Sequence, residues 1–229
     1  MPKRTRPCHE VGIHPLHLWC LHCLRTLLKD GEREAGEPFE VKYLIDGTTS
    51  VLCNQCSARN NICDLVSAGM LKDDLDFSLV VEWQKKFFLK DEDEDEGEDL
   101  SPVVCEQIAC AIITLGEAFD AVETAHRRQF RLIGPKKEVA HAREVYKRVL
   151  LARRSLLQQE LGPRPLQAGP VLRDYRRRAM LRVLPGDADF VTWQVALRQF
   201  LIEVEKVVRM ALNNTDDDEV DDWWDNMRG

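Results

Sequence analysis

Two Cys-x-x-Cys pairs are the residues of this sequence whose types and spacing could do chemistry. Cys20 and Cys23 form the first pair, and Cys53 and Cys56 form the second after an interval of 29 residues. Two such pairs are a common way for a short segment to present four thiolates to a tetrahedral zinc ion. The spacing predicts one structural zinc bound by these four cysteines. Cys63 is either a core thiol or a substitute ligand.

The cellular compartment decides between metal and disulfide chemistry for the eight cysteines of the chain. No apolar signal-peptide core follows the basic N-terminus, and the longest apolar run, near 109–115, is far shorter than the roughly 20 residues of a membrane span. We therefore expect a nuclear or cytoplasmic protein without membrane association, where thiols stay reduced. Metal binding is then favoured over two alternatives, a small core of reduced cysteines and a redox enzyme. His17 and His22 lie close enough to substitute as ligands.

A β-hairpin is predicted between the two cysteine pairs. Apolar residues alternate with other residues from Phe39 to Ile45, and Asp46-Gly47 follows. Asp-Gly is typical of a tight hairpin turn, because glycine adopts positive φ without steric cost. The segment 48–52 would be the returning strand and would lead directly into Cys53. Helices are predicted around this unit at 14–29, 57–71 and 78–90.

A run of acidic residues divides the chain. Residues 91–99 contain eight acids in nine positions, a density that favours a solvated linker. We therefore predict a mainly α protein with four parts: a zinc-binding module with a small β-hairpin and short helices at 1–90, an acidic linker at 91–100, a helical bundle at 101–215, and an acidic tail at 216–229.

Three long helices are predicted within 101–215. Ser101-Pro102 is a typical helix start, with serine as the N-cap and proline at the first helical position. Each helix carries apolar residues at helical spacing, as an antiparallel bundle requires. The predicted stripes are Val104, Ile108, Ile112, Leu115, Phe119 and Val122; Val145, Val149, Ala152 and Leu156; and Phe190, Trp193, Leu197, Phe200, Val204, Val207 and Ala211.

Charge is strongly segregated along the chain. Residues 105–215 carry a net charge of +7, while 67–104 carry −8 and 216–229 carry −6. Clustered basic residues could neutralise phosphates or bind an acidic partner. The acidic tail also contains two adjacent tryptophans, which need a surface to dock on. The candidate contact residues for nucleic acid or a protein partner are Arg143, Lys147, Arg154, Arg176, Arg177, Arg178, Trp223 and Trp224.

The order of the motifs resembles a treble-clef zinc finger over residues 16–70. The chain has a Cys-x-x-Cys pair, a loop, a predicted hairpin, and a Cys-x-x-Cys pair that opens a predicted helix. In that family a knuckle supplies two ligands and a helix N-terminus supplies two more. The positive partial charge of a helix N-terminus stabilises thiolates, which gives the arrangement its physical sense.

A second resemblance covers less of the chain. Cys53, Cys56 and Cys63 have the spacing of one half of the fungal two-zinc, six-cysteine transcription-factor finger. Asp30 stands where the other half would need its third cysteine, and Arg59 is the only basic residue between Cys56 and Cys63. This resemblance implies DNA binding, but the chain lacks these residues of the family pattern.

Three classes of function follow from these patterns. A closed four-thiolate site implies structure and not catalysis, so we expect a non-enzymatic, zinc-stabilised interaction or regulatory protein that binds another macromolecule, most plainly a protein. The alternative is a nucleic-acid-binding, transcription-factor-like protein that uses the basic helical surface. An enzyme is the least favoured class, since the sequence contains no glycine-rich phosphate loop, no Gly-x-Ser-x-Gly and no His-Glu-x-x-His.

Overall fold

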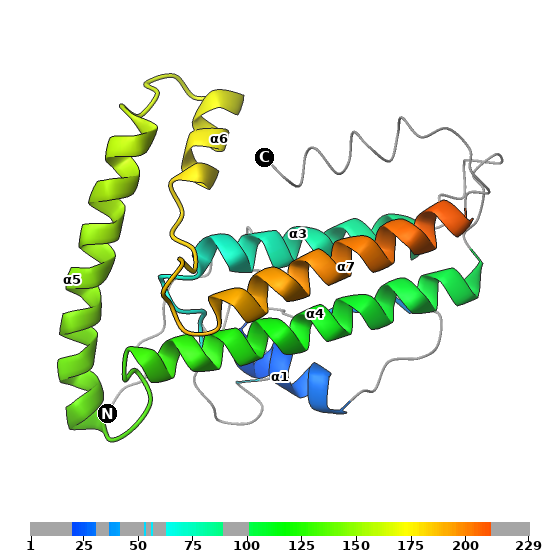
Figure 1. Ribbon diagram of the computed structural model, residues 1–229, viewed down its shortest axis with the longest axis horizontal. Coiled ribbons are helices and arrows are strands. Elements are labelled where there is room, and N and C mark those ends of the chain that lie inside the picture. The colour runs from blue at the N-terminus through cyan, green and yellow to red at the C-terminus, as the bar shows by residue number, and fades with distance from the viewer. Residues whose placement is uncertain are drawn as a thin grey trace, which may run out of the picture.

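The protein is mainly helical, as predicted. The computed structural model describes residues 20–30, 37–41, 53, 56, 63–88 and 101–211. This described part contains six helices and no strand (Figure 1). They are α1 (Leu21–Asp30), α3 (Leu71–Phe88), α4 (Pro102–Gln129), α5 (Lys136–Leu161), α6 (Pro170–Arg178) and α7 (Phe190–Ala211).

Helices α4 and α7 form the centre of the bundle. They run antiparallel and make the most extensive contact between helices, with α3 and α1 packed on α4 (Figure 1). Phe119 of α4 stacks on Phe77 of α3 with ring centroids 5.4 Å apart and meets Trp193 of α7 edge-on at 5.6 Å. All three side chains are fully buried. The aromatic contacts therefore join α3, α4 and α7 into one core.

A glycine allows α4 to approach two neighbours closely. A β-carbon at Gly116 would lie 3.1 Å from Phe77 Cζ and 3.2 Å from Leu28 Cδ2. Leu28 belongs to α1 and Phe77 to α3, so the absence of a side chain at Gly116 lets three helices meet at this point. A larger residue would force them apart, because protein interiors are close-packed.

The predicted start and stripe of α4 are confirmed. Ser101 is the N-cap, its Oγ accepts a hydrogen bond from the backbone N–H of Val104, and Pro102 is the first helical residue. The stripe from Ile108 to Val122 is buried. By length and hydropathy α4 could also cross a membrane, but 44% of the apolar stretch that meets this criterion is buried inside the structure. The buried part of α4 includes the stripe from Ile108 to Val122, which belongs to the main core.

The stripe predicted for α7 is confirmed in part, and the one predicted for α5 is wrong. On α7, Trp193, Phe200 and Val204 are buried. On α5, Val145 and Leu156 are exposed, and the buried residues are Val139, Ala142, Tyr146 and Leu150. The buried face of α5 is rotated from the predicted one because Tyr146 and Leu150 pack on residues 130–132 and 181 instead of on a parallel bundle helix.

Helices α5 and α6 leave the bundle. Figure 1 shows α5 standing across the end of the bundle, with α6 returning beside it. We call α5, the 162–169 connection and α6 the arm. Among the described residues, a small hydrophobic cluster around Tyr146, Leu150 and Leu181 is separate from the main core. The prediction that all the long helices of 101–215 share one antiparallel bundle is therefore wrong for α5.

The N-terminal region differs from its predicted secondary structure. Residues 63–67 are irregular where a helix over 57–71 was expected, and α3 begins at Leu71 instead of residue 78. Phe39, the start of the predicted hairpin, pairs its backbone N–H and C=O with the side-chain amide of Gln84, a buried residue of α3. Residues 42–52 of the hairpin lie outside the described residues.

One hydrophobic core crosses the position of the predicted linker. It includes Leu21 and Leu24 of α1, Phe77 of α3, and Ile112 and Phe119 of α4. The acidic residues 91–100 and the tail 216–229 lie outside the described residues, so the four-part division stays a prediction. The packing nevertheless makes the N-terminal helices part of the same interior as α4 and α7.

Candidate metal centre

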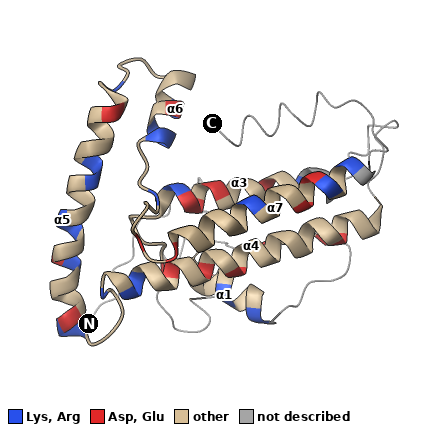
Figure 2. Cartoon of the chain, in the orientation of Figure 1, with Lys and Arg blue, Asp and Glu red and all other residues tan. Residues whose placement is uncertain are grey.

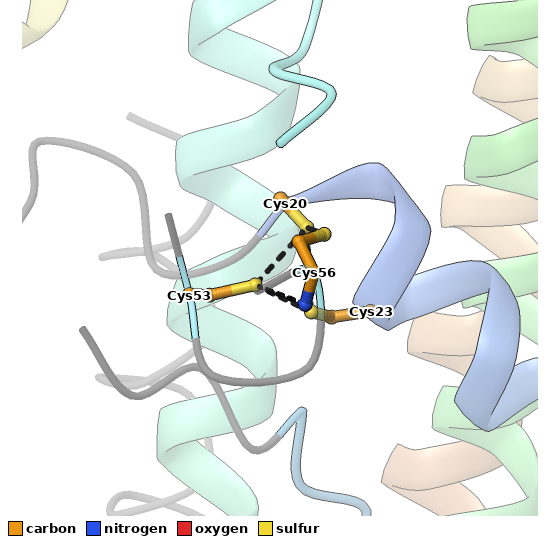
Figure 3. Close-up of side chains that lie close together, drawn as sticks. All are labelled: Cys20, Cys23, Cys53 and Cys56. Atoms are coloured by element: carbon orange, nitrogen blue, oxygen red, sulfur yellow. Dashed lines mark hydrogen bonds between the residues drawn. The ribbon is translucent and has the colours of Figure 1, made fainter. Parts of the chain in front are cut away.

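The four cysteines of the two Cys-x-x-Cys pairs come together in the structure. Their side chains converge from α1 and from the segment around residues 53–56 (Figure 3). Cys20, Cys23, Cys53 and Cys56 are between 0% and 2% exposed. All four belong to the main hydrophobic core. Residues from two distant parts of the chain therefore form one buried cluster.

The sulfur spacing matches a tetrahedral metal site. A tetrahedral ion with metal–sulfur bonds of about 2.3 Å holds its ligands about 3.8 Å apart. Cys20 Sγ lies 3.3, 3.8 and 3.5 Å from the Sγ atoms of Cys23, Cys53 and Cys56, and Cys23 Sγ lies 3.3 Å from Cys53 Sγ. A disulfide would need about 2.05 Å, and all four are free thiols. The cluster could therefore hold one metal ion.

The first cysteine pair sits at a helix N-terminus. The carbonyl of Cys20 accepts hydrogen bonds from the N–H groups of Cys23 and Leu24, so Cys20 precedes α1 and Cys23 lies in its first turn. A helix N-terminus favours negative charge and stabilises thiolates. The treble-clef comparison assigned this role to the second pair. Cys56 has helical backbone conformation, but residues 57–62 lie outside the described residues.

Burial and mutual hydrogen bonding shift the pKa values of the thiols in opposite directions. The hydrogen bond with Cys23 lowers the pKa of Cys20 to about 4 despite the cost of burial. The same bond raises the pKa of Cys23, and burial raises the pKa of Cys56. A thiolate is thus favoured at Cys20, and its negative charge opposes ionisation of Cys23 and Cys56. A divalent cation among the four sulfurs would reverse that opposition, since a coordinating thiol is deprotonated.

Cys63 lies beside the cluster and takes a different role. Its Sγ accepts a hydrogen bond of 3.2 Å from the backbone N–H of Cys53, while the N–H of Cys56 lies 3.4 Å from Cys53 Sγ. Cys63 is only partly buried, and the group that could hold a metal consists of the other four. His22 is exposed on α1, and His17 lies outside the described residues.

An ion-pair network fixes α1 and the 63–67 segment against α4. Asp64 accepts two hydrogen bonds from Arg127 of α4, at 2.8 and 2.9 Å, and one from Arg25 of α1 at 3.3 Å. Arg25 also donates to Asp120 of α4 at 2.6 Å. The N–H of Leu21 donates to the carbonyl of Asp64. The network therefore holds the start of α1, and with it Cys20 and Cys23, in a fixed position.

The network continues to a buried carboxylate. Glu123 is 0% exposed, and its Oε1 accepts hydrogen bonds from the Ser67 N–H, the Ser67 hydroxyl and Arg127 Nε. Burial raises the pKa of Glu123 against the opposing effect of Arg127 and Ser67. The network was not predicted from sequence, because many of its pairs are 39 to 99 positions apart and share no motif. The only signal was weak: acidic and basic residues at helical spacing inside apolar α4.

A second set of buried hydrogen bonds joins the arm to the bundle. The Gly69 N–H donates to the Tyr146 hydroxyl at 2.9 Å, and that hydroxyl lies 2.8 Å from His126 Nε2. The donor of this second contact depends on the histidine tautomer: Tyr146 donates when the imidazole proton is on Nδ1 and accepts when it is on Nε2. Burial lowers the pKa of His126 to about 4 and raises that of Tyr146 to about 12. Both groups are therefore uncharged near neutral pH.

The predicted contact residues on the arm are mostly exposed. Figure 2 marks basic positions along both α5 and α6. Arg143, Lys147 and Arg154 are exposed on α5, and Lys147 pairs with Glu144 at 2.7 Å. On α6, Arg177 lies 3.6 Å from Asp76 and Arg178 lies 3.7 Å from Asp174. These two distances indicate weak ion pairs.

The remaining predicted contacts divide between the arm and the tail. Arg176 is exposed on α6, while Trp223 and Trp224 lie outside the described residues. The structure therefore brings the basic candidates together on one arm. Comparisons with protein-family models, with curated proteins and with solved structures give no match for this chain.

Proposed function

We propose that Cys20, Cys23, Cys53 and Cys56 bind one structural zinc ion. The observation that supports this most strongly is the convergence of four buried sulfur atoms within 4.8 Å of one another. Four soft thiolates in a tetrahedral arrangement suit zinc, or iron as the competing choice. Four protein ligands leave no open position for a substrate. The proposed ion therefore stabilises the fold and does not catalyse a reaction.

The role that fits this site best is binding another macromolecule, most plainly a protein, in a reducing nuclear or cytoplasmic environment. The metal site lies in the same core as α4 and α7, so the ion would hold together a rigid body. The arm stands away from that body and exposes apolar residues, including Leu151 and Val171. Arginine is enriched at protein interfaces, and contiguous exposed apolar surface marks interaction sites.

Metal analysis of the purified full chain tests the zinc proposal. We expect about one zinc per chain, and we expect Cys53→Ser to lose it because three thiolates and a hydroxyl form a weaker site. Cys110→Ser is the matched control, since Cys110 is exposed on α4 and outside the cluster. A zinc-free chain with all thiols freely titratable would overturn the proposal. A strongly coloured chain that contains iron would show that the bound metal is iron instead of zinc.

Nucleic-acid binding is the second candidate, and the exposed row of Arg143, Lys147 and Arg154 on α5 favours it. Binding through these residues would release counterions from duplex DNA. The logarithm of the affinity would then fall steeply with the logarithm of salt concentration. A titration with duplex DNA at two salt concentrations, repeated with Arg143→Glu, tests this candidate. Absence of salt-dependent binding would exclude it.

A further inference from the structure

A pocket of about 360 Å³ lies where the arm meets the end of the bundle. Its volume is near the lower end of the roughly 300–1,000 Å³ range of ligand pockets. Leu156 is 61% exposed and Leu184 is 36% exposed, so apolar surface at the pocket faces solvent. The apolar lining residues are Leu156, Leu157, Leu161, Met180, Leu181 and Leu184.

Four basic side chains and one acidic side chain border this apolar lining: Lys72, Arg153, Arg178, Arg182 and Glu160. Lys72 pairs with Asp76 at 2.6 Å, and Arg153 pairs with the buried Asp187. Arg178 is largely exposed, and its ion pair with Asp174 is long, at 3.7 Å. Arg182 is exposed and forms no salt bridge to a described residue. Two arginines therefore remain available to an anionic ligand.

The surrounding sequence strengthens this positive charge. The stretch from Arg153 to Arg182 contains eight arginines and two acidic residues, a net charge of +6. An apolar cavity inside such a field favours an acidic peptide that carries a bulky apolar side chain. Charge complementarity would orient the peptide, and burial of the apolar side chain would supply affinity.

We infer that this pocket binds the chain's own C-terminal segment, residues 216–229, with Trp223 or Trp224 against the leucine lining. The segment contains seven acidic residues and one arginine, so its charge of −6 is opposite to that of the arm stretch. The inference rests on the proposed role of the arm as a binding surface and is independent of the metal.

The segment is long enough to reach the pocket. Helix α7 has 22 residues and is therefore about 33 Å long. It begins six residues after Leu184, which lines the pocket, so the pocket lies near the N-terminal end of α7. Trp223 lies twelve positions after Ala211, a distance that can span about 40 Å when extended. The tail can thus return along the whole of α7 within one chain.

The second acidic segment of the chain lacks the required chemistry. Residues 91–99 contain eight acids and one glycine, with no apolar side chain to fill a leucine-lined cavity. Residues 216–229 combine acids with two tryptophans, Val220 and Met227. The apolar lining therefore selects the C-terminal segment, although both segments would be attracted by charge.

Photo-crosslinking within the full chain tests this inference. Trp224 is replaced by the photoreactive residue p-benzoylphenylalanine, which inserts into nearby C–H bonds, and the crosslinked peptides are identified by mass spectrometry. We expect crosslinks to residues 156–161 and 180–184, with Met180 as the main acceptor. Mixing isotope-labelled and unlabelled chains should show that both crosslinked peptides come from one chain.

Two substitutions on α5 provide a matched comparison. Leu156→Asp places a carboxylate in the pocket and should reduce the crosslink about tenfold, the factor that 1.4 kcal/mol produces. Leu151→Asp makes the same change at a side chain that is 63% exposed and does not line the pocket, so it should have no effect. Both residues are solvent-exposed, so neither change should unfold the protein.

Three results would overturn the inference: crosslinks to other surfaces, crosslinks between chains, or equal effects of the two leucine substitutions. Binding of a separate acidic protein at the pocket while residues 216–229 stay uncrosslinked would also overturn it. Metal content is measured on the same preparation. A full complement of metal without the expected crosslinks would contradict the tail inference alone, and the reverse result would contradict the zinc proposal alone.

Discussion

The interior of the bundle and the outer face of the arm place apolar side chains in opposite environments. In the bundle, Phe77, Phe119 and Trp193 are fully buried and in contact with one another. On the arm, Leu151 is 63% exposed and Val171 is 70% exposed. Burial of apolar surface stabilises a fold, whereas exposed apolar surface is available to a ligand. The bundle interior therefore accounts for stability, whereas the exposed apolar side chains of the arm, like Val191 and Ile202 on the bundle surface, are available to a ligand.

Charged side chains show the same contrast. Arg25 and Arg127 of the bundle are engaged by Asp64, Asp120 and Glu123 in a partly buried network. The arginines of α6 are largely exposed or form only long ion pairs. Buried pairs fix the relative positions of helices, since removing one partner leaves a charge without compensation. Exposed arginines retain their capacity to bind an anion.

Loss of the metal site should have the largest effect and should reach beyond the cysteines. Cys53→Ser, or a chelator, should destabilise the bundle by roughly 5 kcal/mol or more, because metal binding contributes directly to folding. The cysteines share the core of Phe77 and Phe119, so unfolding should spread to α3 and α4. Guanidinium unfolding monitored by tryptophan fluorescence measures this, with Cys110→Ser as the control. An unchanged transition would show that the bundle folds independently of the cysteine site.

A pair of truncations measures the contrast between bundle and arm directly. Phe119→Ala should reduce the free energy of unfolding by about 3–5 kcal/mol, because it leaves a cavity between Phe77 and Trp193. Leu151→Ala on the arm should change it by less than about 0.5 kcal/mol. Urea denaturation of both variants provides the comparison. Similar losses would mean that the exposed face of α5 is covered in solution.

The histidine between bundle and arm should make stability depend on pH. Burial lowers the pKa of His126 from 6.5 to about 4, so between these values the unfolded state binds more protons and stability falls on acidification. A shift of this size corresponds to about 3 kcal/mol at pH 4. Burial raises the pKa of Asp73 from 3.8 to about 6, which has the opposite sign: the folded state binds more protons there, and acidification stabilises it.

The variant His126→Gln separates these two contributions. It should lose less stability than the wild type when the pH falls from 7 to 4, because a glutamine side chain does not titrate in this range while Asp73 still does. His141→Gln is the control, since His141 is exposed on α5. Denaturant titrations at several pH values measure the difference, and the four cysteines are unchanged in all variants. Parallel pH profiles for wild type and His126→Gln would contradict the prediction.

Local patterns predicted the helices that pack on a long continuous face. The stripe of α4 could be read from sequence because Ile108, Ile112, Leu115 and Phe119 recur at the helical period and are all buried. The four cysteines could also be grouped, since their spacing is a motif in its own right. Both features depend on residues that are close in sequence or follow a simple repeat.

Other features depend on contacts that no local pattern encodes. The buried face of α5 is set by the reach of Tyr146 to His126 and Gly69, 20 and 77 positions away. Phe39 pairs with the side chain of Gln84 where alternation of residue types indicated a strand partner. In the first case a polar side chain of the helix itself reaches distant residues, and in the second a polar side chain of a distant helix pairs with the backbone of Phe39.

Helix capping should give the smallest effect and extends the comparison to the ends of the helices. Ser101 Oγ caps α4, whereas the N-caps of α5 and α6, Pro135 and Gly169, form no side-chain cap hydrogen bond. Ser101→Ala should therefore lower the free energy of unfolding by about 1 kcal/mol. The 3.4 Å bond to Val104 and the exposure of Ser101 favour the lower half of the usual range. Thermal denaturation should show a lowered midpoint, and Ser101→Asp should restore it because aspartate also caps and favours the helix dipole. Failure of aspartate to restore stability would show that the start of α4 is held by packing of its first turn, as the uncapped helices of the arm must be.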